Sequence, residues 1–227
     1  MLRRGTFCSA SAFCALFIFL CSSMRAADPS KLPLHEGWKL QSSRKVSDTG
    51  EAISSQGYST GGWYTITVPT TVVAAQVASG EFKDPYFGMN LRQLPGMTYP
   101  IGLNSFSNLP MEKDSPYAVS WWYREEFQLP AEYAGRTVWL NFQGINYRAN
   151  IWLNGRKLAD SREVAGAYRT YEFDASTIVK SGTNVLAVEV SLPPKRSSES
   201  IGWIGILPLP TKTWGSGEMF ISQAAVR

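Results

Sequence analysis

The most constraining feature of the sequence is a series of segments between residues 119 and 190 in which apolar and polar residues alternate. They read VSWWYREEF, RTVWLNFQG, YRANIWLNGRKLA, YRTYEF and NVLAVEV, and they are rich in β-branched and aromatic residues. No long helical pattern separates them. Short strands at this spacing predict an all-β fold, an antiparallel β-sandwich, in which Asn154-Gly155 forms a type I′ hairpin turn.

The half of the chain before these strands is less regular. GWKLQSS and GWYTITVP predict two short strands separated by a Ser/Gly-rich loop. PTTVVAAQVASGEF predicts one short helix, with Thr70 or Thr71 as its N-cap and Gly80 at its end. Asp174 is expected to cap a single further turn before Gly182. Residues 83–115 lack any period and are rich in Pro, Gly, Asn and aromatics. Long loops of this kind in compact domains are usually functional.

The first 27 residues have the composition of a secretory signal peptide. Arg3 and Arg4 precede an apolar run, and small residues follow. We therefore expect residues 1–27 to be cleaved and the product to be secreted, or periplasmic in a bacterium, with no membrane association afterwards. All three cysteines lie inside this segment, so we expect neither disulfides nor thiolate chemistry in the mature protein. They are Cys8, Cys14 and Cys21.

Most of the net positive charge of the chain comes from the same segment. The formal net charge is +4, from 22 Lys and Arg against 18 Asp and Glu. Loss of Arg3, Arg4 and Arg25 with the signal leaves a nearly neutral protein. Beyond the short PPKRSS there is no basic stripe, so we predict that the protein does not bind nucleic acid. The only histidine is His35, and with no cysteine to join it we expect no metal and no cofactor.

Carboxylates are the remaining candidates for catalysis, since glycoside cleavage needs an acid and a base or nucleophile in one cleft. Glu125 and Glu126 are adjacent in a predicted strand, where at least one must face solvent, and Asp174 has the position of a cap. No spacing marks a catalytic pair, and we assign no catalytic residue. The carboxylates considered are Asp84, Glu125, Glu126, Asp160, Glu163 and Asp174.

The aromatic residues are better candidates for a binding role. Trp121 and Trp122 are consecutive, so one should face the core and the other should form either a packing surface or a platform for a sugar ring. The irregular loop supplies further rings and an amide, which suit polyhydroxylated ligands. These loop candidates are Tyr86, Phe87, Asn90 and Tyr99.

Three stretches carry a resemblance to a known family. DSPYAVSWWYREEF, GRTVWLNFQGINYRANIWLNGRKLA and GAYRTYEFDASTIVKSGTNVLAVEV resemble, in order and spacing, the N-terminal sugar-binding jelly-roll domain of glycoside hydrolase family 2. FKDPYFGMNLRQLPG resembles the loop before the WWYR strand in its exo-β-glucosaminidase and β-mannosidase branch. The similarity covers roughly residues 34–203, so the predicted domain is 28–203.

The resemblance implies a multidomain secreted hydrolase. In that family the sandwich packs beside immunoglobulin-like domains and a (β/α)₈ barrel that holds both catalytic glutamates, so this chain would lack the catalytic residues. The sandwich lends side chains to the rim of the sugar pocket. On position in the motif, Asn90 is the residue carried over, and the candidate sugar-binding set is Asn90, Tyr86, Trp121, Trp122 and Trp203.

The chain departs from the family pattern after IGW. The family continues with a stretch like DWNPAPPDKDMGIWRDVYL, whereas this chain reads IGILPLPTKTWGSGEMFISQ. Written in permitted codons and read in a shifted frame, that tail spells W-N-P-A-P-P-D-K-D-M and then G-I-W-R-D-V-Y-L. We therefore expect residues 204–227 to be a frame-shifted translation, poorly ordered, and the sandwich to lack its last strand.

The leading hypothesis is thus the N-terminal sugar-binding domain of a secreted exo-β-glucosaminidase or β-mannosidase, truncated and inactive alone, with a β-linked glycan as its partner. Two alternatives stay open. One is a free-standing lectin-like module that binds β-glycans without cleaving them. The other is a non-functional translation of a damaged gene. The sequence leaves the sugar specificity and the oligomeric state undetermined.

Overall fold

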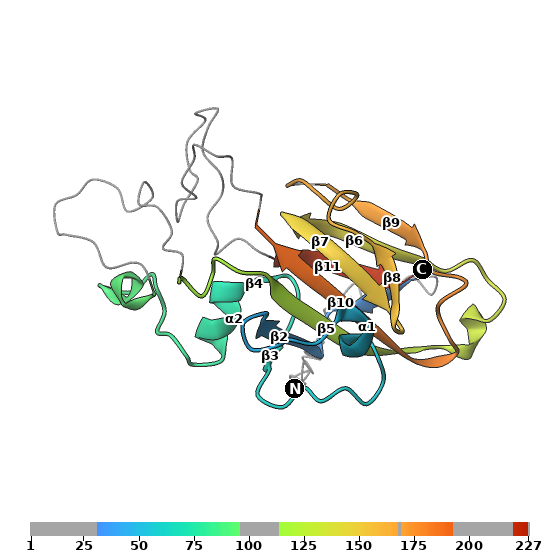
Figure 1. Cartoon of the computed structure of the whole chain (residues 1–227), viewed down its shortest axis with the longest axis horizontal. Helices are drawn as coiled ribbons and strands as arrows, with labels where there is room; N and C mark the ends of the chain where they lie inside the picture. Colours follow the sequence, from blue (N-terminus) through green and yellow to red (C-terminus); the bar gives the residue numbers. More distant parts are fainter. Residues whose placement is uncertain (1–30, 96–113, 168, 193–219, 227) are drawn as a thin grey trace, which may run out of the picture.

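The computed structural model describes residues 31–95, 114–167, 169–192 and 220–226, and they form two antiparallel sheets packed face to face (Figure 1). Sheet A has the strand order β1-β11-β6-β9, with β4 also paired to β11, and sheet B has the order β3-β2-β5-β10-β7-β8. The prediction of an all-β sandwich with one or two short helices is confirmed. The strands are β1 Leu32–Leu34, β2 Trp38–Ser42, β3 Tyr64–Ile66, β4 Thr70–Thr71, β5 Trp121–Leu129, β6 Trp139–Asn146, β7 Arg148–Leu153, β8 Arg156–Ala159, β9 Tyr171–Asp174, β10 Gly182–Ser191 and β11 Phe220–Val226.

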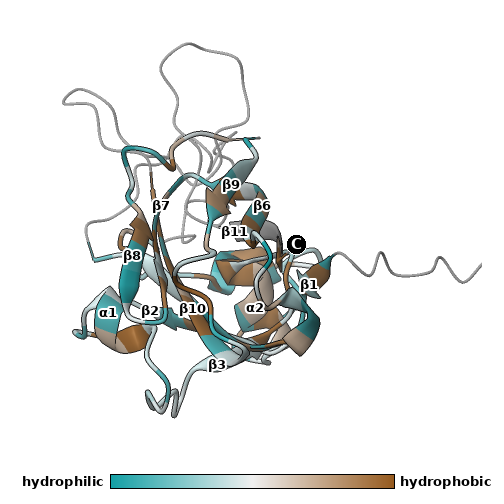
Figure 2. Cartoon of the chain, turned by 90° about the vertical axis from the view of Figure 1, so that its right-hand side faces the viewer, coloured by the Kyte–Doolittle hydropathy of each residue, from teal (hydrophilic) through white to brown (hydrophobic). Residues whose placement is uncertain are grey.

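The main core lies between the sheets and follows the predicted alternation. Leu140 and Phe142 of β6 are buried on the same side as Val138, and Tyr123 and Phe127 of β5 face them from sheet B. Burial of each such side chain contributes about 1.5–3 kcal/mol. In Figure 2 the central strands β7 and β10 are largely hydrophobic, whereas the edge strand β8 is hydrophilic. The two sheets therefore hold together through the inward positions of their central strands.

A second, smaller core covers the outer face of sheet B. Helix α1, Gly50–Ile53, places Ile53 against Trp122 and Trp152. The buried guanidinium of Arg124 donates from Nε to the Ile53 carbonyl at 2.9 Å and from Nη2 to the Ser55 carbonyl at 3.2 Å. The sequence predicted only a Ser/Gly-rich loop here. Arg124 thus fastens this loop to the sheet.

Gly50 of α1 packs directly against the Trp152 ring of β7, and replacing it should lower stability. A Cβ at Gly50 would lie 2.2 Å from Cδ2 and Cε2 of the Trp152 ring. That ring is held by a 2.9 Å hydrogen bond from its Nε1 to Glu51 Oε1. We expect Gly50→Ala to lower the free energy of unfolding by about 1–3 kcal/mol in urea titrations, as for other overpacked cores.

Gly61→Ala is the matched control for this prediction. At Gly61 a Cβ would meet only Ser59 Oγ, at 3.7 Å. This exposed substitution should change stability by less than about 0.5 kcal/mol. Equal unfolding midpoints for the two variants would contradict the close packing of α1 on Trp152.

The predicted hairpin and helix are both confirmed. Asn154 and Gly155 have φ angles of 51° and 79°, as a type I′ turn requires. The Asn154 side chain also accepts a hydrogen bond from Val185 N at 2.9 Å, so it ties the hairpin to β10. Helix α2, Val72–Ala78, is capped by Thr71 Oγ1, which accepts from Ala74 N at 3.1 Å. Gly80 follows it with a φ of 81°.

The turn after β9 matches its prediction in part. Asp174 Oδ1 accepts a hydrogen bond from Ser176 N at 2.9 Å, as a capping carboxylate would. The backbone then bonds from Val179 N to Ala175 O at 2.9 Å, which closes one turn. This turn is not assigned as a helix, and it leads directly to the residues before β10.

Strand β11 contradicts the expectation of a poorly ordered tail over 204–227. Phe220–Val226 lies between β1 and β6 in sheet A, with Val226 opposite both Leu32 and Leu140. The Val226 side chain is only 1% exposed. Sheet ladders are built from backbone groups, which any segment without proline supplies, and this segment contains none. The prediction is therefore wrong for 220–226, while residues 204–219 and 227 and the predicted signal at 1–27 lie outside the described residues.

Candidate functional site

The loop after α2 is closed on itself by two polar side chains. Asp84 Oδ1 accepts from Tyr86 N at 2.9 Å, and the Asp84 carbonyl accepts from Phe87 N at 3.2 Å. Asn90 Nδ2 donates to the same Asp84 carbonyl at 2.9 Å, and Asn90 N donates to Phe87 O at 3.2 Å. Asn90 therefore begins the short 3-10 helix η1, Asn90–Gln93, and joins the end of the loop to its beginning.

The closed loop presents three large apolar side chains to solvent. Tyr86 is 96% exposed, Phe87 75% and Met89 60%. Figure 1 shows this loop, in green, extending beyond α2 at one end of the sandwich. Adjacent exposed aromatics on a hydrogen-bonded loop mark a contact surface for a ligand or for another domain. The structure thus brings two predicted residues, Tyr86 and Asn90, together, and it gives the Asn90 amide a structural bond in addition.

The two consecutive tryptophans take opposite faces of β5, as predicted, but both are enclosed by protein. Trp121 is 2% exposed, stacks on Tyr117 with 6.5 Å between ring centroids, and donates from Nε1 to the Pro116 carbonyl at 3.2 Å. Trp122 is 4% exposed and lies 5.3 Å from the Trp152 ring in the outer core of sheet B. Neither ring is available to a sugar, so the structure removes both from the candidate set.

Two other predicted aromatics, Tyr99 and Trp203, lie outside the described residues. The expectation that Trp203 contacts sugar therefore stays a prediction. The loop residues Tyr86 and Asn90 are the members of the predicted sugar-binding set that the structure keeps at an accessible surface.

Several of the candidate carboxylates accept hydrogen bonds from neighbouring residues. Arg162 donates to Asp160 at 2.6 Å and holds the pKa of that carboxyl at about 2, and Glu126 accepts from Arg124 at 3.1 Å. Hydrogen bonds from Ser176 lower the pKa of Asp174. Glu125 and Glu126 point to opposite sides of β5. Nothing in this arrangement forms the facing pair that glycoside cleavage requires, so it supports no catalytic assignment within the described sandwich.

Glu125 is an unusual residue that the sequence did not reveal. It faces the sandwich interior, is 6% exposed, and its Oε2 has no hydrogen-bond partner among the described residues. Both carboxylate oxygens lie 3.4 Å from the position that a Cβ on Gly37 would take. Burial raises the pKa of Glu125 to about 8, against a lowering by the charges of Arg124 and Lys39. Ionisation of this buried acid changes the stability of the fold. Because the side chain is enclosed by protein, it cannot contact a substrate.

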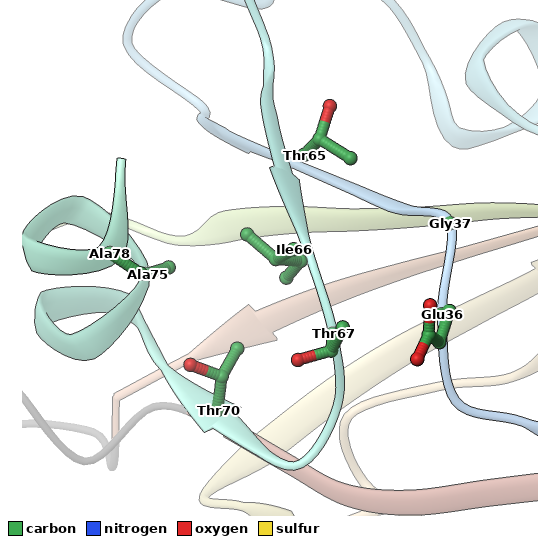
Figure 3. Close-up of a pocket in the computed structure, with 8 residues that line it drawn as sticks. All are labelled: Glu36, Gly37, Thr65, Ile66, Thr67, Thr70, Ala75 and Ala78. Carbon is green, nitrogen blue, oxygen red and sulfur yellow. The ribbon is translucent and has the colours of Figure 1, made fainter. Parts of the chain in front are cut away.

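A pocket of about 280 Å³ lies between α2, β3 and the turn before β2 (Figure 3). Ala75 and Ala78 face it from the helix, and Glu36 lies beyond Thr67 on the opposite side. Its lining has no aromatic ring and includes none of the predicted site residues. The lining residues are Glu36, Gly37, Thr65, Ile66, Thr67, Thr70, Ala75 and Ala78.

Groups of three or more His, Cys, Asp or Glu side chains able to hold a metal ion do not occur within the described ranges. No helix there is both long and apolar enough to cross a bilayer. His35, the residue considered for metal binding, is exposed, and its carbonyl accepts a hydrogen bond from Val68 N at 2.8 Å.

Comparison with known proteins identifies the domain. Residues 111–213 match the family described as glycosyl hydrolase 2 galactose-binding domain-like. The exo-β-D-glucosaminidase of Streptomyces avermitilis is 33% identical over 180 residues, which are 79% of this chain and 18% of that protein. The exo-β-D-glucosaminidase of Amycolatopsis orientalis is 31% identical over 182 residues, which are 80% of this chain and 16% of that protein.

Solved structures agree with the sequence matches. The crystal structure of the Amycolatopsis orientalis exo-chitosanase superposes with a TM-score of 0.65 at 27% identity, over 87% of this chain and 20% of that one. A β-D-mannosidase from Dictyoglomus thermophilum shares the fold, with a TM-score of 0.53 at 18% identity. The chain thus spans about a fifth or less of the length of these proteins. The chain belongs to glycoside hydrolase family 2, and it carries that family's N-terminal galactose-binding-like domain.

Proposed function

We propose that this chain is the N-terminal sugar-binding domain of a secreted, exo-acting hydrolase of β-linked glucosaminides that serves carbohydrate catabolism. The observation that carries the proposal is the 33% identity, across 79% of the chain, to a protein named exo-β-D-glucosaminidase. A β-mannoside is the second substrate class, which the resemblance of the loop before the WWYR strand to the β-mannosidase branch favours less strongly. Because the matched region is only 18% of that enzyme, we assign hydrolysis to the remainder of a longer protein and expect this chain alone to be inactive.

In this proposal the loop of Tyr86, Phe87, Met89 and Asn90 forms one rim of a sugar pocket that another domain completes. Its exposed rings supply the contact area. Its internal hydrogen bonds to Asp84 fix its shape before binding, which lowers the entropic cost of binding.

Residues 1–27 act as the secretory signal in the same proposal, and residues 204–227 arise by translation in a shifted frame. The codon pattern of the tail supports the shift. The expected lack of order in this tail does not support the shift, because residues 220–226 form strand β11. In this proposal the reading frame of this chain and that of the longer enzyme diverge near codon 204.

Hydrolysis assays test this proposal. We expect the 227-residue chain to release no p-nitrophenol from p-nitrophenyl β-D-glucosaminide, and the longer protein encoded in the shifted frame to release it. In that longer protein, Tyr86→Ala should raise KM more than it lowers kcat, because the ring contributes binding at the rim. Hydrolysis by the short chain would refute the assignment of catalysis to another domain. Glycan binding with no hydrolysis by either protein would favour a lectin-like module.

A further inference from the structure

The outer face of sheet A carries a row of polar side chains and one tryptophan. The proposed function assigns no role to them. This face consists of Trp139, Asn141 and Gln143 on β6, and Glu172 and Asp174 on β9. Register places Asn141 opposite Glu172 and Trp139 opposite Asp174. The helices pack elsewhere, α1 mainly on β7, β8 and β10, and α2 on β3 and β4.

Hydrogen bonds fix the side chains of this face relative to one another. Asn141 Nδ2 donates to Glu172 Oε1 at 2.6 Å, and Gln143 Nε2 donates to Asn141 Oδ1 at 2.8 Å. Trp139 adds a ring that is 36% exposed, the only tryptophan among the exposed large hydrophobic side chains of the described residues. At a strand rise of about 3.4 Å per residue, the row from Trp139 to Gln143 is about 14 Å long, enough for more than one pyranose ring.

The two strands β6 and β9 contribute charge of one sign to this face. Strands β6 and β9 contain two carboxylates, Glu172 and Asp174, and neither strand contains a Lys or an Arg. The Asp174 carboxylate accepts hydrogen bonds from Ser176 N and from Ser176 Oγ, which favour its ionised form. A ligand that matches the face therefore carries positive charge, hydroxyl groups and a flat apolar surface.

We propose that the outer face of sheet A is a second glycan-binding surface, which holds an oligomer of β-linked glucosamine through its protonated amines. The choice of sugar rests on the proposed function, whereas the requirement for a cationic glycan follows from the face itself. Trp139 stacks against one pyranose ring, Asn141 and Gln143 bond hydroxyl groups, and Glu172 and Asp174 attract the amines. Such a surface would keep a polymeric substrate attached while its end is cleaved elsewhere.

Binding measurements on the 227-residue chain test this surface. The probe is a glucosamine hexamer, titrated by calorimetry at pH 5.5 and low salt, with the neutral N-acetylglucosamine hexamer as the matched ligand. We expect Trp139→Ala and Glu172→Gln each to weaken glucosamine binding by roughly tenfold. Added salt should weaken it as well, because the attraction is between exposed charges. The control Glu163→Gln removes a carboxylate from the turn after β8 and should leave affinity unchanged.

Each outcome decides the question. Absence of binding by the folded chain, equal affinity for the two hexamers, or unchanged affinity in both face variants would overturn the proposal. Self-association of the chain that Trp139→Ala abolishes would show instead that the face pairs two copies. Glu172→Gln keeps the test valid if the tryptophan variant does not fold. Since no hydrolysis is measured, failure of the longer protein to cleave glucosaminides would be a separate result.

Discussion

A chain that ends at Trp203 is expected not to form a stable sandwich. Strand β11 lies inside sheet A, so its removal leaves β1 without a strand partner and exposes one edge of β6. It also removes the pairing that β11 makes with β4. Each buried backbone group left unpaired costs about 1–3 kcal/mol, against a total stability of about 5–15 kcal/mol for a domain. The truncated chain should therefore lose its cooperative unfolding transition.

Urea titration followed by circular dichroism measures this effect. Val226→Ala is the matched control, because it keeps the β11 backbone and removes only methyl groups from a side chain that is 1% exposed. That variant should remain folded and lose about 1–3 kcal/mol. Identical midpoints for the truncated and full-length chains would show that the tail takes no part in the sandwich, as its sequence suggested.

Stability is also expected to fall as the pH rises from 4.5 to 8, because of Glu125. Burial raises the pKa of this carboxyl to about 8 in the folded chain, whereas its ordinary value is near 4.5. Between these values the folded state holds a proton that the unfolded state has released, so raising the pH favours unfolding. The slope of the free energy of unfolding approaches about 1.4 kcal/mol per pH unit, for a total loss on the order of 5 kcal/mol.

Glu125→Gln should flatten this pH profile, since an amide of similar shape does not ionise. At pH 8 the variant should be more stable than the parent chain by several kcal/mol, and at pH 4.5 the two should differ little. Glu126→Gln is the control on the same strand. Glu126 pairs with Arg124 at a partly exposed position, and such an ion pair contributes about 0–1 kcal/mol to stability. Parallel profiles for the parent and Glu125→Gln would contradict the account of Glu125.

The features of the fold that the sequence predicts correctly depend on neighbouring residues alone. Alternation in RTVWLNF places Val138, Leu140 and Phe142 in the core. Asn154-Gly155 has the backbone angles that its residue types favour, and Thr71 caps α2 through a local hydrogen bond. Each of these features depends only on residues that are close in the sequence, so it can be predicted from the sequence alone.

Features that depend on distant contacts could not be predicted. Period-2 alternation places Trp122 on the outer face of β5, but it contains no information that α1 and the loop around it cover that face. Alternation shows only that at least one of Glu125 and Glu126 faces solvent, and it does not show that the β1–β2 turn closes over Glu125 at Gly37. The strand β11 was missed because the tail departs from the family sequence, whereas pairing in a sheet depends mainly on backbone geometry.

The candidate site was predicted in part for the same reason. Tyr86 and Asn90 could be named from the loop composition and the family resemblance, and the structure keeps both on one loop. The role of Asp84 in closing that loop required the folded geometry, because it depends on a backbone carbonyl and not on a motif.

Sequencing the genomic locus and its transcript from codon 190 past the stop codon tests whether this chain is the sugar-binding portion of a longer family 2 hydrolase. We propose that it is. This proposal predicts that the shifted frame continues through W-N-P-A-P-P-D-K-D-M into a final strand, immunoglobulin-like domains and a catalytic barrel. A transcript that ends after Arg227, with no such frame in the following DNA, would contradict the proposal.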